Sequence, residues 1–224
     1  MTEPLRDQCV VRGLIFCITV AGTLASACTQ GAGEGYVQSV PGTNLYVRDC
    51  WNGAFSLEPT FFGANPFSQN AMAIRVQRGD DNQEVSDGLS VMINDVQTLR
   101  QPDHLNQPQQ VGLPAGVSPP GMPLMLKTDP PSISLTLYLH DSCHIQNGAV
   151  YSIGGTITFT NLFSGNPNET NSDNRLTDAY FDDIQFADPR DMSTDYKFSD
   201  AVTSHVKGAF KFYFQRGQPA QPFP

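Results

Sequence analysis

The sequence predicts an all-β protein whose antiparallel strands form a β-sandwich of the jelly-roll or Ig-like type. Apolar and polar residues alternate with a period of two in several segments, as in strands that pack one face and expose the other. Clusters of Gly, Asn, Asp and Pro separate these segments, and no stretch beyond residue 30 shows a helical stripe. A single sheet would leave its apolar face in water, so we expect two sheets packed face to face.

The folded domain is expected to cover residues 44–216. Its clearest strand is residues 132–139, in which every second side chain is aliphatic. The expected apolar faces, in chain order, are Met72, Ile74 and Val76; Leu89, Val91 and Ile93; Ile133, Leu135, Leu137 and Leu139; Ile157 and Phe159; Tyr180, Ile184 and Phe186; and Phe210, Phe212 and Phe214. Asp182 interrupts the face that begins at Tyr180.

The first 27 residues have the organisation of a signal peptide. Residues 1–12 are polar and mixed in charge, and residues 13–24 (GLIFCITVAGTL) carry no charge. As a helix, the uncharged run that ends at Ala27 would span about 22 Å. That length is short for a membrane-spanning segment and usual for the apolar part of a signal peptide. We therefore expect residues 1–27 to direct export.

The sequence Ala25-Ser26-Ala27-Cys28 resembles the lipobox that ends the signal peptide of bacterial lipoprotein precursors. Both positions before the cysteine match, whereas Leu24 lies one position upstream of the usual leucine. The resemblance implies that Cys28 receives a diacylglycerol and becomes the mature N-terminus. The alternative is ordinary cleavage after the Ala-x-Ala sequence, which would leave Cys28 as a thiol. The alternating pattern downstream is also similar to small exported lipoproteins of bacteria, a similarity that transfers no site.

Three segments are expected to lie outside the strands. Residues 28–43 are rich in Gly, Ser and Pro and predict a flexible tether. Residues 99–131 hold eight of the 17 prolines and predict a long loop without regular strand or helix. Residues 217–224 predict a proline-rich tail.

The cysteines predict one disulfide. Of the five, Cys9 and Cys17 lie in the signal peptide, which leaves three in the exported chain. An odd number in an exported protein needs an explanation. Lipidation of Cys28 supplies one and leaves Cys50 and Cys143 to pair in an oxidising compartment. The alternative is two buried thiols that do not pair.

The charge balance excludes two classes of partner. The chain has 13 Lys and Arg against 22 Asp and Glu, a net charge of -9. Nucleic-acid binding requires clustered Lys and Arg, and so does an electrostatic hold on anionic lipid. The expected partners are therefore a membrane, reached through the lipid on Cys28, and a carbohydrate or an envelope protein.

The sequence contains no recognisable catalytic constellation or glycine-rich phosphate loop, so no catalytic residue is assigned. Aspartates crowd between residues 173 and 195, beside several asparagines. Calcium binds about six to eight oxygens of such groups, so calcium is the one cofactor considered. Its candidate ligands are Asp173, Asp182, Asp183 and Asp188. The alternative is that these residues stabilise solvated turns and that the protein holds no cofactor.

Aromatic side chains supply the candidates for ligand contact. Exposed aromatic residues bind sugars or proteins because they combine a large apolar area with a polar tip. The candidates are Tyr46, Trp51, Tyr138 and Tyr213, of which Tyr138 and Tyr213 lie on the polar sides of their strands. The alternative for Tyr46 and Trp51 is that they cover the core next to Cys50.

The sequence as a whole predicts a non-catalytic lipoprotein of the cell envelope, whose β-domain binds a ligand or has a structural role. The lipoprotein resemblance implies the outer membrane, because retention at the inner membrane usually needs Asp at the position that Thr29 occupies. The alternative function is a carbohydrate-active hydrolase that uses Asp182 or a neighbour, or a calcium-dependent carbohydrate-binding module.

Overall fold

The computed structural model describes residues 33–79, 83–122, 130–143 and 148–215. Within these ranges every pair of strands is antiparallel, which confirms the predicted all-β antiparallel fold. Eleven strands form one hydrogen-bonded sheet, and two short strands form a second. In the described part of the chain, no helix is long and apolar enough to cross a membrane.

The strands of the large sheet are β1 (Gly33–Ser39), β4 (Ser56–Leu57), β5 (Phe61–Pro66), β6 (Met72–Arg78), β7 (Asp87–Ile93), β8 (Pro108–Gln110), β9 (Ile133–Leu139), β10 (Ala149–Gly154), β11 (Thr156–Asn161), β12 (Leu176–Ala187) and β13 (Ser204–Tyr213). The small sheet pairs β2 (Leu45–Val47) with β3 (Trp51–Gly53). One short helix, α1 (Val96–Leu99), and four single 3₁₀ turns connect them: η1 (Gln83–Val85), η2 (Asp173–Arg175), η3 (Pro189–Asp191) and η4 (Asp200–Val202).

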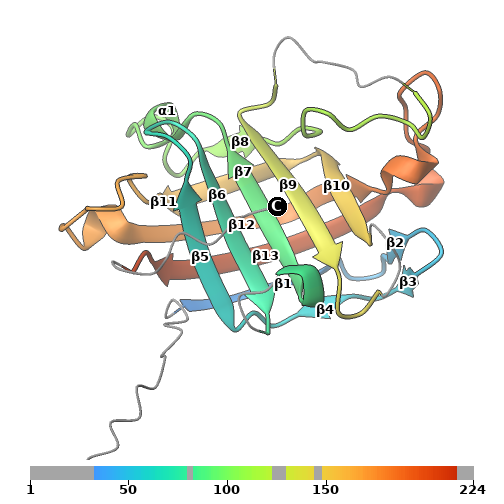
Figure 1. The fold of residues 1–224 in the computed structure, drawn as a ribbon, viewed down its shortest axis with the longest axis horizontal. Helices are drawn as coiled ribbons and strands as arrows, with labels where there is room; N and C mark the ends of the chain where they lie inside the picture. Colours follow the sequence, from blue (N-terminus) through green and yellow to red (C-terminus); the bar gives the residue numbers. More distant parts are fainter. Residues whose placement is uncertain (1–32, 80–82, 123–129, 144–147, 216–224) are drawn as a thin grey trace, which may run out of the picture.

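The large sheet curls so that its two halves face each other. Figure 1 shows β5, β6, β7 and β9 side by side in a front layer, with β12, β13 and β11 crossing behind them. β10 pairs with β9 on one edge and with β12 on the other, so hydrogen bonding continues from one layer to the next. The prediction of two separate sheets therefore needs correction, because one curled sheet covers its own apolar face.

The core fills the space between the two layers. The aliphatic face of β9, predicted from residues 132–139, is fully buried there, as are the predicted apolar faces of β6 and β7. Phe210 and Phe212 of β13 meet them from the back layer. Phe62 of β5 stacks on Phe212 of β13, with ring centroids 5.9 Å apart, and this contact joins the edge strand of the front layer to the back layer.

The predicted apolar face of β12 is correct in its second half and wrong in its first. Phe181 is buried and Tyr180 is exposed, whereas Ile184 and Phe186 are buried as expected. The register against β13 shifts between Phe181 and Ile184, which marks a β-bulge. Because the bulge adds a residue to one strand, it exchanges the inward and outward positions on either side of it.

The prediction of a tether over residues 28–43 is wrong for residues 33–39, which form β1 and pair with β13 and β4. The glycines in this segment permit a close approach of strands. A Cβ on Gly35 would lie 2.6 Å from the carbonyl oxygen of Ala209, and one on Gly33 would lie 2.7 Å from Cβ of Phe212. Residues 28–32 are outside the described part of the chain.

The proline-rich segment also contains more structure than the predicted loop. β8 pairs with β11 over three residues, with Pro108 at its first position. A proline is tolerated at the start of an edge strand because its missing N–H is not needed there. Residues 123–129 and the tail, residues 216–224, are outside the described part.

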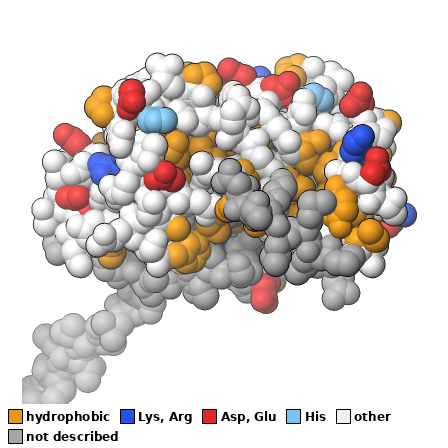
Figure 2. Space-filling model, turned by 90° about the horizontal axis from the view of Figure 1, so that it is seen from above, with side chains coloured by type: hydrophobic (Ala, Val, Ile, Leu, Met, Phe, Trp, Pro, Cys, Tyr) orange, Lys and Arg blue, Asp and Glu red, His pale blue; other side chains and the backbone are white. Residues whose placement is uncertain are grey.

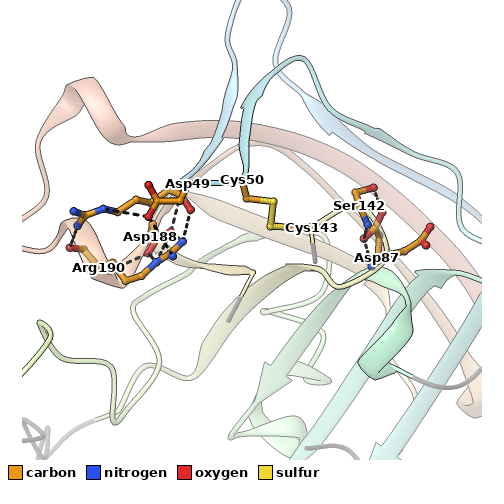
Figure 3. Close-up of a disulfide and its surroundings, with 9 residues drawn as sticks. Asp49, Cys50, Asp87, Ser142, Cys143, Asp188 and Arg190 are labelled. Atoms are coloured by element: carbon orange, nitrogen blue, oxygen red, sulfur yellow. Dashed lines mark hydrogen bonds and ion pairs between the residues drawn. A yellow bond between two sulfur atoms is a disulfide. The ribbon is translucent and has the colours of Figure 1, made fainter. Parts of the chain in front are cut away.

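The predicted disulfide is confirmed. Cys50, just before β3, is bonded to Cys143, after β9, and their Cα atoms are 5.7 Å apart (Figure 3). The turn before Cys143 is held by the buried carboxylate of Asp87. This carboxylate accepts the backbone N–H groups of Asp141 and Ser142, each at 3.0 Å, and the hydroxyl of Ser142. The bond therefore ties the small sheet to a rigid end of the large one.

We expect Cys50→Ser to lower the melting temperature in oxidising buffer. A disulfide that closes a loop of about 93 residues contributes about 4.6 kcal/mol on the chain-entropy model, which corresponds to a fall of roughly 10–15 °C. Differential scanning calorimetry measures this fall in melting temperature. Cys143→Ser should give the same value, the double variant should fall no further, and Cys28→Ser should melt like the wild type. A wild-type melting temperature that reductant does not change would contradict the role given to this bond.

Candidate functional site

A hollow of about 590 Å³ lies on the outer face of the front layer. Its floor consists of outward-facing residues of β6, β7, β9 and β10, and its rim includes parts of the proline-rich segment. The described lining residues are Ala73, Gln83, Ser90, Met92, Asn94, Pro114, Ala115, Pro131, Ser134, Thr136, Tyr138, His140, Ala149 and Tyr151. A concave site of this size, with apolar walls and a few polar groups, has the usual character of a small-molecule site.

Tyr138 lies at the base of this hollow and is 1% exposed. Its hydroxyl donates a hydrogen bond to Oε1 of Gln77 at 2.8 Å. The ring lies over Gly88, its partner on β7, where a Cβ would come within 2.4 Å of the phenolic oxygen. Burial raises the pKa of Tyr138, so the phenol stays neutral and keeps its donor proton at physiological pH.

The prediction that Tyr138 is an exposed contact is therefore wrong. Period-two alternation places Tyr138 correctly on the outer side of β9, but this side of the strand is not exposed to solvent at that position. Gly88 on the neighbouring strand leaves room for the ring to lie down on the sheet, and His140 packs against it with centroids 5.3 Å apart. Alternation predicts the face of a side chain and does not predict what covers it.

Two further rings give the hollow directional hydrogen-bonding groups. Nδ1 of His140 is 2.7 Å from the carbonyl oxygen of Gln83. Since a carbonyl can only accept, Nδ1 carries a hydrogen, and in the neutral ring Nε2 is left as an acceptor. Burial, and then the charge of Asp188, raise the pKa of Tyr151, so this phenol also stays neutral.

Among the described lining residues there is no Asp, Glu, Lys or Arg. The hydroxyls of Ser90, Ser134 and Thr136 add neutral donors and acceptors beside apolar side chains such as Met92. This composition suits an uncharged ligand, because a charged one would lose its hydration without gaining a counter-charge.

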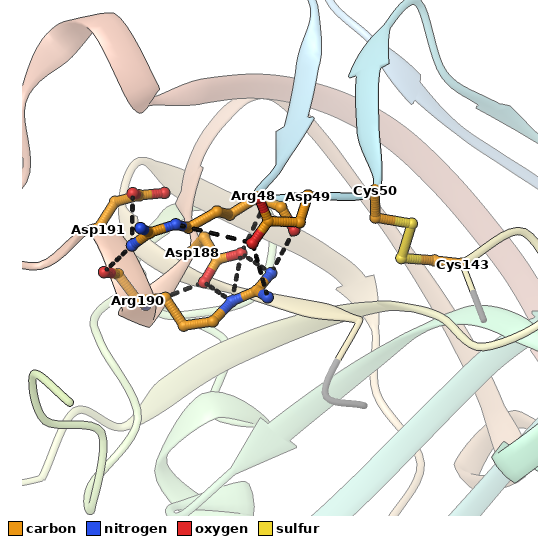
Figure 4. A network of polar contacts seen from close by, with 7 residues as sticks. All are labelled: Arg48, Asp49, Cys50, Cys143, Asp188, Arg190 and Asp191. Atoms are coloured by element: carbon orange, nitrogen blue, oxygen red, sulfur yellow. Dashed lines mark hydrogen bonds and ion pairs between the residues drawn. A yellow bond between two sulfur atoms is a disulfide. The ribbon is translucent and has the colours of Figure 1, made fainter. Parts of the chain in front are cut away.

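A second polar cluster lies beside the disulfide (Figure 4). The carboxylate of Asp188 is fully buried and accepts the backbone N–H of Arg48 at 3.0 Å, while the guanidinium of Arg190 bonds both of its oxygens. Arg48 in turn donates to the carbonyl of Arg190 at 2.9 Å. These bonds join the end of β2 to the segment that follows β12, so Asp188 has a structural role.

The calcium candidates do not come together as a ligand set. Asp188 bonds arginine, Asp183 accepts a hydrogen bond from Nδ1 of His205 at 2.7 Å, and Asp182 is exposed at the bulge of β12. Asp173 begins the 3₁₀ turn η2, before the strand. Across the described ranges, no three His, Cys, Asp or Glu side chains are grouped as a metal ion would require.

The remaining aromatic candidates are dispersed. Tyr213 is 46% exposed at the end of β13 and is not one of the residues that line the hollow. Trp51 is half-buried and packs edge-on against Phe55, with ring centroids 6.2 Å apart, and Tyr46 is half-buried on β2. The reading in which Trp51 covers the core next to Cys50 agrees with this contact. Cys28, the predicted lipidation site, lies outside the described residues.

Sequence reasoning missed Tyr151 and His140 as neighbours of Tyr138 in one hollow. The sequence contains only part of the information that would identify this site. Tyr151 and Thr136 occupy polar positions of alternating strands, but their pairing depends on the register between β9 and β10.

Comparisons with protein-family models, with curated proteins and with solved structures found no match to this chain. The site must therefore be interpreted from its own chemistry.

The polar cluster around Asp188, Arg48 and Arg190 also contains Asp191, which predicts that the stability of the fold depends on pH. Burial, and then the charge of Asp188, raise the pKa of Asp191, although Arg48 lies 3.5 Å away. The charged carboxylate is thus less favourable in the folded than in the unfolded chain, and this cost is present above the unfolded pKa. Asp191→Asn should raise the stability at pH 7 by roughly 0.5 kcal/mol, and most of the gain should be lost near pH 3, where the carboxyl is mostly protonated in both the folded and the unfolded chain.

Thermal melts at the two pH values measure this difference. Asp195→Asn is the matched control, because a hydrogen bond from Ser193 lowers the pKa of Asp195 and its removal should not stabilise the fold. A lower melting temperature for Asp191→Asn at pH 7 would show that the ion pair with Arg48 outweighs burial.

Proposed function

We propose that the chain is the precursor of a non-catalytic lipoprotein of the cell envelope that binds an uncharged ligand in the hollow on its outer face. Residues 1–27 direct export, Cys28 carries the lipid, and the curled sheet is the exported domain. The proposed location is the outer membrane, on the basis of Thr29 after the lipidated cysteine. The hollow between β6 and β10 is the observation that supports binding.

The disulfide supports export. A bond between Cys50 and Cys143 suits an oxidising compartment, since thiols of cytosolic proteins are kept reduced. Once this pair is formed, Cys28 is the odd cysteine of the exported chain. Lipidation of Cys28 accounts for it without a free thiol or a second chain.

The proposed anchor holds the domain close to the lipid. Strand β1 begins at Gly33, so only residues 29–32 separate Cys28 from the sheet. Four residues span at most about 14 Å when extended. Two or more acyl chains at this point would give stable attachment. The domain is therefore expected to lie against the membrane surface instead of hanging from a long tether.

A binding role is preferred over the hydrolase alternative because no observed pair of groups favours catalysis. Asp182 is exposed, and its neighbour Asp183 is hydrogen-bonded to His205. The phenols at the hollow are held neutral, which suits hydrogen bonding to a ligand and does not suit proton abstraction.

The intact mass of the mature chain tests the anchor. In membrane extracts we expect a chain that begins at Cys28 and carries acyl groups, and its mass should rise by about two daltons on reduction, as one disulfide takes up two hydrogens. Cys28→Ser is the control and should lose both the acyl mass and the membrane association. An unmodified mature chain that begins at Cys28 would overturn the proposed anchor.

Filling the hollow tests the ligand site. The probe is 2-naphthol, a neutral ring with one hydroxyl, whose fluorescence reports binding to the full chain. Ser90→Trp places an indole in the hollow and should weaken binding of this probe by at least about tenfold, which is about 1.4 kcal/mol. Ser56→Trp makes the same change at an exposed position of β4 and should leave binding unchanged. Equal weakening by both variants, or no saturable binding, would contradict the site.

A further inference from the structure

The floor of the hollow on the front layer contains a row of three side chains that carry hydroxyls. Ser90 of β7 lies opposite Thr136 of β9, and Thr136 lies opposite Tyr151 of β10 on its other side. All three residues line the hollow, so their side chains project from the same face of the sheet. Neighbouring strands lie about 4.8 Å apart, so the row extends over about 10 Å across the floor.

The hydroxyls of this row are not used to hold the fold. Ser90, Thr136 and Tyr151 make no side-chain hydrogen bond to any part of the chain that the structure describes. The same holds for Ser134, which lines the hollow two positions before Thr136 on the same face of β9. By contrast, the buried hydroxyl of Ser152 accepts one backbone N–H and donates to one backbone carbonyl, both at 2.8 Å. A hydroxyl has one donor and two acceptor sites, so the floor keeps this capacity for a ligand.

Two groups at the edge of the floor are oriented by bonds to the backbone. Nδ1 of His140 donates to the carbonyl of Gln83, and in the neutral ring Nε2 remains an acceptor. Nδ2 of Asn94 donates to the carbonyl of Pro131 at 2.9 Å, which directs the amide and leaves Oδ1 as an acceptor. The hollow therefore offers acceptors at fixed positions beside hydroxyls that turn to donate or to accept.

A ligand that satisfies this floor must carry several hydroxyl groups. Rotatable hydroxyls that both donate and accept pair best with groups of the same dual capacity. A purely apolar ligand would remove water from Ser90, Thr136 and Tyr151 without replacing the hydrogen bonds that this water makes. A charged ligand would find no counter-charge among the described lining residues.

The hollow also supplies apolar contact beside the hydroxyls. Met92 lies two positions after Ser90 on the same face of β7, and Ala73 of β6 lies opposite Met92. The ring of Tyr151 is half-buried at the other end of the row. A sugar ring meets both conditions, because its hydroxyls bond polar groups while its C–H face packs on an apolar or aromatic surface.

The rim of the hollow is also uncharged where it is described. Asn94 lies just before α1 and Pro131 just before β9, so both belong to the end of the molecule that carries α1. Figure 2 looks down on this end and shows hydrophobic side chains in patches among uncharged polar ones, with most charged side chains toward its edge. The character of this end agrees with an uncharged ligand.

We propose that the ligand of the hollow is a short uncharged saccharide, with hydroxyls bonded to Ser90, Thr136 and Tyr151 and a C–H face packed on Met92. This inference rests on the proposed function, because it names the class of ligand for the same hollow. The volume of about 590 Å³ suits a ligand of this size, and the row of hydroxyls bonds it at several points.

Isothermal titration of the full chain with maltose, cellobiose and N,N′-diacetylchitobiose tests this inference. The chain is held in phosphocholine micelles, since detergents with sugar headgroups would compete. At least one of these disaccharides should bind with a dissociation constant of about 1 mM or lower. Thr136→Val keeps the shape of the side chain and removes its hydroxyl, so it should weaken that binding by at least about fivefold, because a buried ligand hydroxyl loses its partner. Tyr151→Phe should also weaken the binding.

Thr156→Val is the matched control, because it makes the same change on β11, outside the lining of the hollow, and should leave the affinity unchanged. Thr136→Val should change the affinity for 2-naphthol by less than about twofold, since that probe gains most of its binding from an apolar ring. A melting temperature close to that of the wild type shows that each variant is folded.

The outcomes separate the saccharide from the proposed function. Saturable binding of 2-naphthol, together with no binding of the three sugars at about 10 mM, would overturn the saccharide and leave the site. The absence of binding by both kinds of probe would contradict the site as well. The inference also fails if a sugar binds equally to the wild type and to Ser90→Trp, or if Thr136→Val and Tyr151→Phe both bind it as tightly as the wild type does.

Discussion

The structure depends on one constraint, which is that a single antiparallel sheet must cover its own apolar face. It does so by curling at β9, β10 and β12, where hydrogen bonding passes from the front layer to the back. At the other end of the sheet, β5 approaches the back layer through side chains, with Phe62 stacked on Phe212. Gly33 lies against both rings, and a Cβ there would be 2.8 Å from Phe62. The start of β1 is thus part of the closure, which explains why this glycine-rich segment forms a strand from Gly33 onward.

The disulfide and the buried carboxylates stabilise two parts of the structure outside the curled sheet, the small sheet and the turn before Cys143. The small sheet of β2 and β3 belongs to neither layer, and it is tied down by the disulfide and by the bonds from Asp188 to Arg48 (Figure 4). Asp87 fixes the turn that presents Cys143 (Figure 3). Buried carboxylates that carry such bonds are costly to lose, because removal leaves donors buried without partners. Asp188, one of the four calcium candidates, is used in this way to hold the fold.

Much of the fold could be predicted from the sequence, because alternation reports the faces of strands directly. The buried sides of β6, β7, β9, β11 and β13 are the predicted ones. The predictions that were wrong concern positions whose structure is determined by contacts between segments distant in sequence. Tyr180 and Phe181 exchange places because β12 has a bulge, and the bulge is defined by its pairing with β13. The glycines near Gly35 resemble a linker in composition, but they permit the contact with Ala209.

The candidate sites were less predictable for the same reason. The hollow depends on contacts such as the hydrogen bond between Gln77 and Tyr138, which are 61 positions apart and meet only when β6, β7 and β9 pair in register. A search for reactive residue types leads to the aspartates, whereas the structure uses several of those in the fold and leaves neutral groups at the hollow.

The proposed lipid on Cys28 would also determine which end of the sheet lies toward the membrane. Gly33 lies beside Phe62 at the first end of β5, and Phe67 follows the last residue of the same strand. The length of β5, about 20 Å for six residues, therefore separates the end of the sheet at Gly33 from the turn that follows Pro66. Figure 1 agrees, with β1 at one end of the front strands and α1 at the other. A domain attached through the lipid at β1 would hold α1 and the turn after β5 on the side away from the membrane.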